Sequence, residues 1–447
     1  MADNPAVISV LSSARPGVFG TAWMLLAGLP AFASGAGPLQ AGVARINLTP
    51  PLEMNAALGG YGARMSRPAT GVHDAVWAKA LVLAQAERKF AVVTADVLAF
   101  PPGFKAAVIQ RLAADELSAD QVLLLASHSH TSIDMMALHP GNGFAIPQVG
   151  LFHKELFENT ADRLATVIRD AAKNLAAIAA ASTVISVPDR NRNRRHGGTI
   201  HDPDLAVVRI DTLEGRPLAA LVNWTAHPTF MDARDMMFSG DWPGHLQRTM
   251  EALIGQGVTV MYYNGAEGDQ SPTPPADCAS NWERAERYGR AMGILAWRAW
   301  ETLRPGTVKV FDYHVQSIVL PRRQPHPDFM KTGGAEYGLD PARMNDFLAR
   351  LVPPATHSAF LRLDDWVILG VPGEMAAQLG LEAKLEARRI TGAGCVTIGG
   401  LADEWIGYAL PAEEYRMGGY EASMSFYGET LGRTLVEGVV RSAGKSK

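Results

Sequence analysis

Short apolar runs alternate along the chain with longer segments in which apolar residues recur every three or four positions. Apolar runs bounded by polar or turn residues predict buried strands, and the longer spacing predicts amphipathic helices. The predicted strands cover residues 78–84, 90–97, 122–126, 205–210, 218–224, 258–263, 366–369 and 395–399. The predicted helices cover residues 104–117, 155–175, 245–254, 282–303, 341–351, 376–390 and 422–440. This alternation predicts an α/β fold, with a mixed sheet core and flanking helices in a single large domain.

Two segments fall outside this pattern. Residues 321–340 are rich in Pro, Gly, His and charge, which predicts a surface excursion within the domain. Near the N-terminus, Arg15 precedes an apolar stretch over residues 18–29 and a small-x-small exit, which is typical of an export signal. We therefore expect a signal peptide or disordered leader over residues 1–40, the domain over residues 41–447, and a secreted or periplasmic location. The long leading segment and Asp3 argue against export, and without export the protein would be cytoplasmic.

The residues that follow the apolar run 122–125 give the strongest local signal for chemistry. Ser127-His128-Ser129-His130 comes directly behind a predicted core strand, and side chains two apart on a strand project to the same side. Open α/β sheets bind ligands outside the carboxyl ends of their strands, so two imidazoles at such an end are candidate metal ligands. The alternative is structural: His130 could cap a helix, and His128 could be a hydrogen-bonded core residue.

Other apolar runs also end in polar residues that suit chemistry. Taken singly, each has a structural alternative: His227 could cap a strand, and Glu374 could begin a helix, where the helix dipole favours it. If the runs share one sheet, however, their polar ends meet in one crevice, and two imidazoles with a carboxylate are ligands that zinc prefers. The residues concerned are Asp96, His227, Asp269 with Ser271, Glu374 and Tyr408.

Composition narrows the classes of function. The 447 residues carry 41 Lys and Arg against 45 Asp and Glu, a formal net charge of −4, which argues against a nucleic-acid-binding protein. Cys278 and Cys395 form neither a disulfide framework nor a C-x-x-C motif, although one bridge between them stays open. A basic cluster over residues 190–195 predicts a loop, which is either a solvated turn or a source of arginines for a carbonyl or anionic oxygen.

The succession of motifs resembles the catalytic domain of the neutral, non-lysosomal ceramidase family. The resemblance runs from about Gly42 to the C-terminus, and its specificity comes from the order of short motifs that are weak one by one. These motifs are Gly59-Gly60-Tyr61-Gly62, Gly71-Val72-His73, Thr94-Ala95-Asp96, Ser127-His128-Ser129-His130-Thr131, Asn223-Trp224-Thr225-Ala226-His227-Pro228, Ser239-Gly240-Asp241, Gly268-Asp269-Gln270-Ser271-Pro272, Pro372-Gly373-Glu374 and Gly407-Tyr408.

The resemblance implies a site for one zinc ion per chain. The four implied ligands are His128, His227, Glu374 and Tyr408. The resemblance also implies that His130 lines the substrate side and that Ser271 is the catalytic serine. Arg194 would lie close to the substrate amide, with Arg192 as a competitor for that role.

The chain departs from the family next to the implied site. Ser132-Ile133-Asp134-Met135-Met136 replaces a glycine-rich stretch, and Ala409-Leu410-Pro411 replaces a threonine-rich one. The pocket should therefore differ, with Met135, Met136 and residues 236–238 either lining an apolar groove or filling the core. The family's C-terminal immunoglobulin-like domain is expected to be absent. These departures leave ceramide itself less well supported than amide hydrolysis.

Together these features predict a zinc-dependent hydrolase that cleaves the amide bond of an N-acyl substrate, either ceramide or a ceramide-like lipid. Metal-activated water would attack the carbonyl, with Ser271 assisting or acting as the nucleophile. Arg194 would stabilise the oxyanion, and His130 or Asp96 would move a proton to the leaving amine. The expected partners are a small N-acyl or lipid substrate and, transiently, a membrane surface.

Three alternatives stay open. An esterase or lactonase could use the same zinc site, and a non-catalytic zinc-binding or carbohydrate-binding scaffold could retain it. A metallo-β-lactamase-like hydrolase requires the spacing H-x-H-x-D-H, but here position 132 is Ser132 and the acid comes at Asp134.

Overall fold

The computed structural model describes residues 37–445, which form one compact unit. Residues 1–36, which contain nearly all of the predicted leader, lie outside the described residues. Among the described residues, no helix has both the length and the apolar character needed to cross a membrane.

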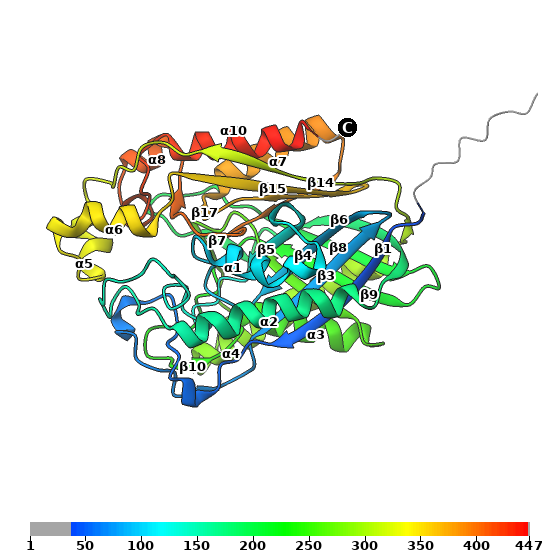
Figure 1. Cartoon of the computed structure of the whole chain (residues 1–447), viewed down its shortest axis with the longest axis horizontal. Helices are drawn as coiled ribbons and strands as arrows, with labels where there is room; N and C mark the ends of the chain where they lie inside the picture. Colours follow the sequence, from blue (N-terminus) through cyan, green and yellow to red (C-terminus); the bar gives the residue numbers. More distant parts are fainter. Residues whose placement is uncertain (1–36, 446–447) are drawn as a thin grey trace, which may run out of the picture. The chain divides into compact units, whose positions relative to one another are not determined.

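A nine-stranded mixed sheet lies at the centre of the fold (Figure 1), as the sequence pattern predicts. Its order is β11-β9-β8-β6-β1-β3-β4-β5, with β13 beside β6. The β4–β5 and β9–β11 pairs are parallel, and the other pairs are antiparallel. The strands are β1 Gln40–Asn47, β3 Trp77–Gln85, β4 Arg88–Ala95, β5 Val122–Ala126, β6 Ala176–Ser186, β8 Asp204–Thr212, β9 Pro217–Trp224, β11 Thr259–Asn264 and β13 Gly306–Thr307.

A four-stranded sheet packs against one face of the central sheet. Leu123 and Leu125 of β5 share a buried cluster with Trp366 and Ile368 of the smaller sheet, so the two sheets enclose a common core. The order of the smaller sheet is β14 Phe311–Val319, β15 Ala355–Leu363, β16 Trp366–Gly370 and β18 Cys395–Gly399.

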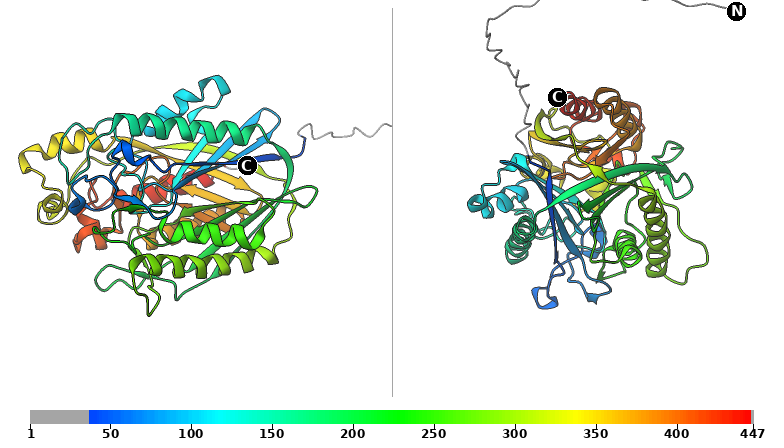
Figure 2. Two further views of the ribbon diagram at one scale, coloured as in Figure 1. Left: turned by 90° about the horizontal axis from the view of Figure 1, so that it is seen from below. Right: turned by 90° about the vertical axis from the view of Figure 1, so that its right-hand side faces the viewer.

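Helices cover the outer faces of both sheets (Figure 2). Helices α1 and α2 lie on the β1–β3–β4 side of the central sheet, α3 and α4 on its β8–β11 side, and α7 and α10 on the smaller sheet. The longer helices are α1 Phe104–Arg111, α2 Lys154–Ala172, α3 Asp241–Ile254, α4 Asn281–Thr302, α6 Met344–Leu351, α7 Ala377–Thr391 and α10 Leu431–Ala443.

Strand β5 shows why the strand before the histidines is uniformly apolar. Leu123 and Leu125 point into the core between the sheets, whereas Val122 and Leu124 point into the core beneath α1 and α2. Because both faces of β5 are covered, its sequence does not alternate between apolar and polar residues. Each fully buried Leu or Val side chain stabilises the fold by about 1.5–3 kcal/mol relative to an exposed one.

The sequence pattern does not predict strands β6, β14 and β15. In β6 and β14, most positions are only partly buried, and β6 is rich in alanine, so neither carries a continuous apolar run. Strand β15 begins with the polar sequence Ala355-Thr356-His357-Ser358 before its apolar half. Pairing with neighbouring strands, rather than local pattern, decides these segments.

Two predicted segments are wrong in detail. The single helix expected over residues 422–440 is interrupted: α9 Tyr420–Ser423 ends early and α10 begins at Leu431, because Gly428 adopts a φ of +74° and Ser425 pairs with Gly407. Residues 321–340 are not simply a surface excursion. They contain α5 Gly333–Glu336, and Phe329 is buried in the core cluster of the smaller sheet.

Candidate metal centre and substrate pocket

Two short parallel strands deliver Glu374 and Tyr408 to one place. β17 Glu374–Met375 pairs with β19 Tyr408–Ala409, and in this register Glu374 lies opposite Tyr408. Glu374 comes four residues after β16 ends, and Tyr408 comes nine residues after β18, the parallel neighbour of β16, ends. The structure therefore brings together two residues that are 34 positions apart in the sequence.

The two histidines implied as ligands follow the carboxyl ends of two strands that are far apart in the order of the central sheet. His128 follows β5 after Ser127, and His227 follows β9. His128 has a φ of +69°, so the histidine pair is not on an extended strand as expected from the two-residue spacing. A turn, rather than a shared strand face, brings His128 and His130 together.

Backbone carbonyls fix the ring orientation of both histidines. His128 donates its Nδ1–H to Leu98 O at 2.7 Å, and His227 donates its Nδ1–H to Glu267 O at 2.8 Å. In a neutral imidazole this leaves Nε2 as a lone-pair acceptor. Such a second contact is the usual way in which a protein fixes the tautomer of a metal-ligating histidine.

The free Nε2 atoms face a carboxylate. Glu374 Oε2 lies 3.0 Å from His227 Nε2 and 3.4 Å from His128 Nε2. Tyr408 Oη lies 3.4 Å from His227 Nε2. Ligand atoms of a tetrahedral zinc lie roughly 3.3–3.4 Å apart, given bonds of about 2.0–2.1 Å. Acceptors that converge at these separations fit a cation between them.

The protonation states of His227 and Glu374 favour a bound cation between these groups over shared protons. Burial and the neighbouring Arg194 lower the pKa of His227 to about 4, so its ring is neutral. Burial acts to raise the pKa of Glu374, but the imidazoles of His128 and His227 hold it well below its usual range. Trp405 donates its indole N–H to Glu374 Oε1 at 2.8 Å and further stabilises the carboxylate.

Tyr408 differs from the other three implied ligands. Burial and the charge of Glu374 raise the pKa of its phenol well above the usual value. Arg194 donates from Nη2 to Tyr408 Oη at 3.0 Å. Tyr408 therefore stays a neutral phenol unless a bound cation lowers its pKa.

His130 also reaches this cluster, with its Nε2 3.4 Å from His128 Nε2. His128, His130 and His227 together could hold a metal ion. However, His130 Nδ1 is buried without a hydrogen-bond partner among the described residues, whereas His128 and His227 each have a carbonyl in that position. His130 thus lacks the second contact of a typical ligand, and it lines the pocket beside His128.

The structure separates the two candidate arginines. Arg194 donates from Nε to Glu421 Oε1 at 2.8 Å and from Nη2 to Gly268 O at 3.0 Å, which holds it beside Tyr408. Arg192 is exposed on β7 Asn191–Asn193. Arg194 is therefore the arginine at the site.

Ser271 lies on β12 Gln270–Pro272, which pairs with β7, and it is not among the residues that line the pocket. The carbonyl before it, Gln270 O, accepts hydrogen bonds from His227 N at 3.0 Å and His227 Nδ1 at 3.1 Å. Among the described residues, no side chain makes a hydrogen bond with the Ser271 hydroxyl. The chain thus offers Ser271 no general base by direct contact.

Asp96 is not brought into this cluster. Its Oδ2 accepts a hydrogen bond from Trp77 N at 3.0 Å, and a Cβ at Gly240 would lie 3.3 Å from the same atom. Asp96 does not line the pocket beside the histidines. Its carboxylate binds the first residue of β3, the strand paired with β4, which gives Asp96 a structural reason for its place at the strand end.

Glu267 is a residue that sequence reasoning overlooks. Its carboxylate is fully buried, and neither oxygen has a hydrogen-bond partner among the described residues. One oxygen lies within 4.8 Å of ligand atoms of His128 and Glu374. Burial and the charge of Glu374 raise its pKa well above the usual value. Glu267 stands two residues before Asp269 in the polar run after β11, but nothing in the sequence distinguishes it from a turn residue.

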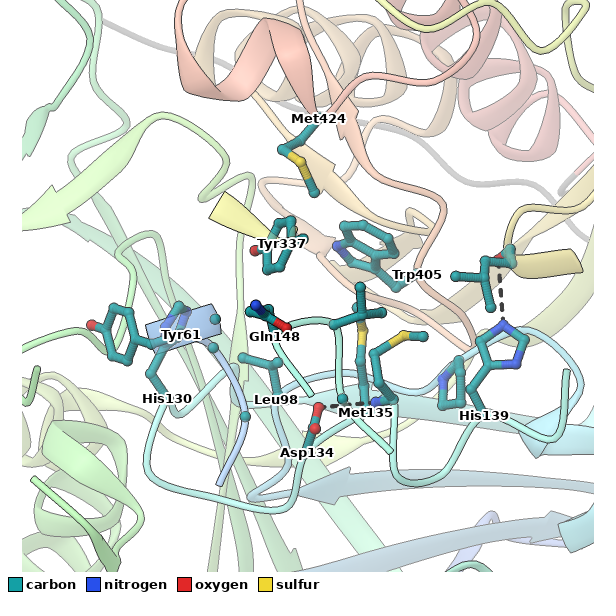
Figure 3. A pocket seen from close by; sticks show the side chains of 18 of the residues that line it. Tyr61, Leu98, His130, Asp134, Met135, His139, Gln148, Tyr337, Trp405 and Met424 are labelled. Atoms are coloured by element: carbon teal, nitrogen blue, oxygen red, sulfur yellow. Dashed lines mark hydrogen bonds between the residues drawn. The ribbon is translucent and has the colours of Figure 1, made fainter. Parts of the chain in front are cut away.

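An apolar pocket opens beside these groups (Figure 3). His128, His130, Glu374 and Tyr408 form one part of its wall. Most of the remaining wall is apolar, with Leu98, Met135, Met136, Phe347, Trp405 and Phe426 among its residues. The predicted groove thus contains Met135 and Met136, whereas Phe238 is buried in the core.

A sequence model described as "Neutral/alkaline non-lysosomal ceramidase, N-terminal" matches residues 39–286. The chain belongs to this family. The matched segment ends before two of the four implied ligands, Glu374 and Tyr408, which are placed beside the others by the fold.

Two solved structures share this fold. The neutral ceramidase from Pseudomonas aeruginosa has a TM-score of 0.77 and 18% sequence identity, over 91% of this chain and 74% of that chain. A ceramidase complexed with C2 has a TM-score of 0.78 and 18% identity, over 91% of this chain and 75% of that chain. No curated protein sequence matches the chain.

Proposed function

We propose that this protein is a zinc-dependent amidohydrolase that cleaves the amide bond of an N-acyl substrate, ceramide or a ceramide-like lipid. One observation carries the proposal: the acceptor atoms of His128, His227 and Glu374 converge at the wall of an apolar pocket. Family membership supports the substrate class, and the TM-score of 0.77 supports the fold.

Zinc would be held by His128, His227 and Glu374, with Tyr408 as the fourth ligand. When bound there, zinc would polarise the substrate carbonyl and lower the pKa of water to about 7. Arg194 keeps Nη1 free of hydrogen bonds among the described residues, so this atom can donate to the oxygen of the amide. Removing one donor of this kind costs roughly 100- to 1000-fold in rate.

His130 is the group best placed to move a proton. Burial and the neighbouring His128 lower its pKa well below the usual value, so its ring is neutral and can accept a proton. Arg64 donates to the backbone carbonyl of His130 and to Gly59 O at 2.5 Å, which fixes the segment. The role is assigned to His130 rather than Asp96, because His130 lines the pocket and reaches the His128 ring, whereas Asp96 binds Trp77 N.

Ser271 would assist the attack or act as the nucleophile. We predict that Ser271→Ala retains about one zinc per chain and loses most amidase activity. Zinc would be measured by mass spectrometry, and turnover against N-acyl sphingoid bases and N-acyl amino acids. Ser317→Ala, an exposed serine on β14, is the matched control and should behave like the wild type.

The outcomes separate the remaining functions. Full activity of Ser271→Ala would refute its catalytic role, and a trapped acyl-enzyme would assign it as the nucleophile. Faster cleavage of a matched ester than of the amide would indicate an esterase or lactonase. Stoichiometric zinc without turnover of any amide or ester would indicate a non-catalytic scaffold.

We also propose that the segment before residue 41 directs export. Arg15, the apolar stretch over residues 18–29 and the small residues that follow support this. N-terminal sequencing of the mature protein would test it, since an uncleaved Met1 in a cytoplasmic fraction would contradict export.

A further inference from the structure

One acidic side chain interrupts the apolar wall of the pocket. Asp134 lies four residues after His130, and its carboxyl group lines the pocket (Figure 3). Its Oδ1 accepts a hydrogen bond from Met136 N at 3.0 Å. Its Oδ2 has no hydrogen-bond partner among the described residues, although the whole residue is only 7% exposed.

The backbone leaves room at this free oxygen. Gly150 has a φ of +119°, and a Cβ at that position would lie 2.7 Å from Asp134 Oδ2 and 2.4 Å from Met136 Cβ. A side chain at residue 150 would therefore cover the carboxyl group. With glycine there, Oδ2 stays accessible from the pocket.

Within residues 37–445, no cationic side chain forms a hydrogen bond or salt bridge with Asp134. Arg64 is the basic residue whose charge acts on Asp134, but both of its Nη atoms donate to backbone carbonyls, those of Gly59, His130, Asp232 and Asp235. Burial raises the pKa of Asp134 to about 7, so the carboxyl group is charged or neutral within the ordinary pH range. A buried carboxyl group without a partner is costly, and a ligand that supplies a hydrogen-bond donor removes that cost.

A purely structural role would not need a carboxylate. The bond from Met136 N to Oδ1 closes a turn of the kind that Asn forms equally well. Oδ2, by contrast, contributes nothing to this turn. The free acceptor is the feature that distinguishes Asp134 from a turn residue.

We propose that Asp134 selects substrates whose chain in this pocket carries a hydrogen-bond donor, a hydroxyl or an ammonium group, at the carbon that reaches Oδ2. This inference rests on the proposed amidase function and specifies its substrate. Gln148, which also lines the pocket, makes no side-chain hydrogen bond among the described residues and can complete the polar contact. Sites built to pair a buried polar group reject analogues that lack the matching group by up to 10⁴-fold or more. At this pocket, which is open to solvent, we expect a preference on the order of 10- to 100-fold in kcat/KM.

The test uses N-acyl amides of one chain length. One has a plain chain, a series carries a single hydroxyl at successive carbons, and a second series carries a single amine. For the zinc-loaded protein at pH 8, we expect one position at which a donor raises kcat/KM at least tenfold over the plain chain. Binding of the same compounds to the protein is measured in parallel by calorimetry, so the preference is tested even without turnover.

Two variants distinguish the two donors. Asp134→Asn keeps the turn acceptor but replaces the anionic oxygen, so an ammonium preference should vanish while a hydroxyl preference persists in part. Asp134→Leu should abolish both preferences. Asp120→Asn, at an exposed aspartate, is the matched control. Zinc content and thermal unfolding show whether each variant is folded.

The results distinguish a wrong role for Asp134 from a wrong proposed function. Turnover of amides with less than a twofold effect of every donor, in rate and in binding, would overturn the role of Asp134 alone. The same holds if folded Asp134→Leu keeps the wild-type preference. A donor preference in binding without turnover would support Asp134 and overturn the amidase proposal.

Discussion

Trp405→Phe is the sharpest test of how the chain holds the metal centre. Trp405 donates its indole N–H to Glu374 Oε1 at 2.8 Å, while Glu374 Oε2 faces the two histidines. Phenylalanine keeps an aromatic ring against Phe426, whose centroid lies 5.9 Å from that of Trp405. The substitution therefore removes one hydrogen bond and leaves all four implied ligands in place.

Two independent magnitudes agree on the expected loss. A hydrogen bond to a charged group contributes about 1.5–3 kcal/mol. Loss of a contact that orients a metal ligand typically lowers metal affinity about 10- to 100-fold, which equals roughly 1.4–2.8 kcal/mol. We expect the dissociation constant for zinc to rise by this factor in Trp405→Phe.

The assay is competition for zinc against a chromophoric chelator, with zinc per chain checked by mass spectrometry. Trp366→Phe is the matched control, because Trp366 is also buried and donates its indole N–H to Tyr263 Oη at 3.3 Å within the core between the sheets. The control should keep wild-type zinc affinity even if it is less stable. Equal zinc affinity in Trp405→Phe and wild type would refute the argument that Glu374 is a ligand oriented by Trp405.

Two further predictions concern buried charges. Asp403 accepts hydrogen bonds from Lys105 Nζ at 2.9 Å, His357 Nε2 at 3.0 Å and Leu124 N at 2.9 Å, so Asp403→Asn should destabilise the fold by about 3–5 kcal/mol in urea unfolding. Burial acts to raise the pKa of Asp403, but Lys105 and the other partners hold it below its usual value. The destabilisation caused by Asp403→Asn should therefore be complete above about pH 4, the pKa of an unfolded Asp, and should decrease as the pH falls through the lower pKa of the folded state. A destabilisation that does not depend on pH would contradict this. Glu267→Gln should raise the thermal stability of the metal-free protein at pH 7, because burial raises the pKa of Glu267 and makes its ionised form costly in the folded state, whereas the amide does not ionise. The same change should weaken zinc binding, because a bound cation favours the ionised carboxylate, which the amide cannot supply. Unchanged values of both quantities would show that Glu267 is satisfied by water and has no part in the centre.

The sequence predicts best where burial is complete. The bounds of β5 and β18 coincide with the predicted ranges 122–126 and 395–399, because both faces of these strands are covered and every residue is buried. It predicts worst where burial is partial, as in β6, or where a distant contact interrupts a periodic segment, as at Ser425 before α10.

The candidate site shows the same division. The ligand types at residues 128, 227, 374 and 408 could be proposed from motif order and resemblance alone. The roles of Trp405 and Glu267 could not be proposed in this way, because each depends on its position next to Glu374. In the sequence, Glu374 lies 31 residues before Trp405 and 107 residues after Glu267. The competing positions of Arg192 and Arg194 are likewise separated only by which of them points to solvent.

The sequence by itself determined the covered strands, the class of fold and the chemical types available at the strand ends, since these follow from short-range periodicity and composition. The tertiary structure alone decided that β17 and β19 pair with Glu374 opposite Tyr408, that backbone carbonyls fix the tautomers of His128 and His227, and that Asp96 lies apart from the pocket. The physical reason is that a metal centre depends on separations of 3–4 Å between side chains. Those separations are set by the register of strands far apart in the chain, about which local pattern carries no information.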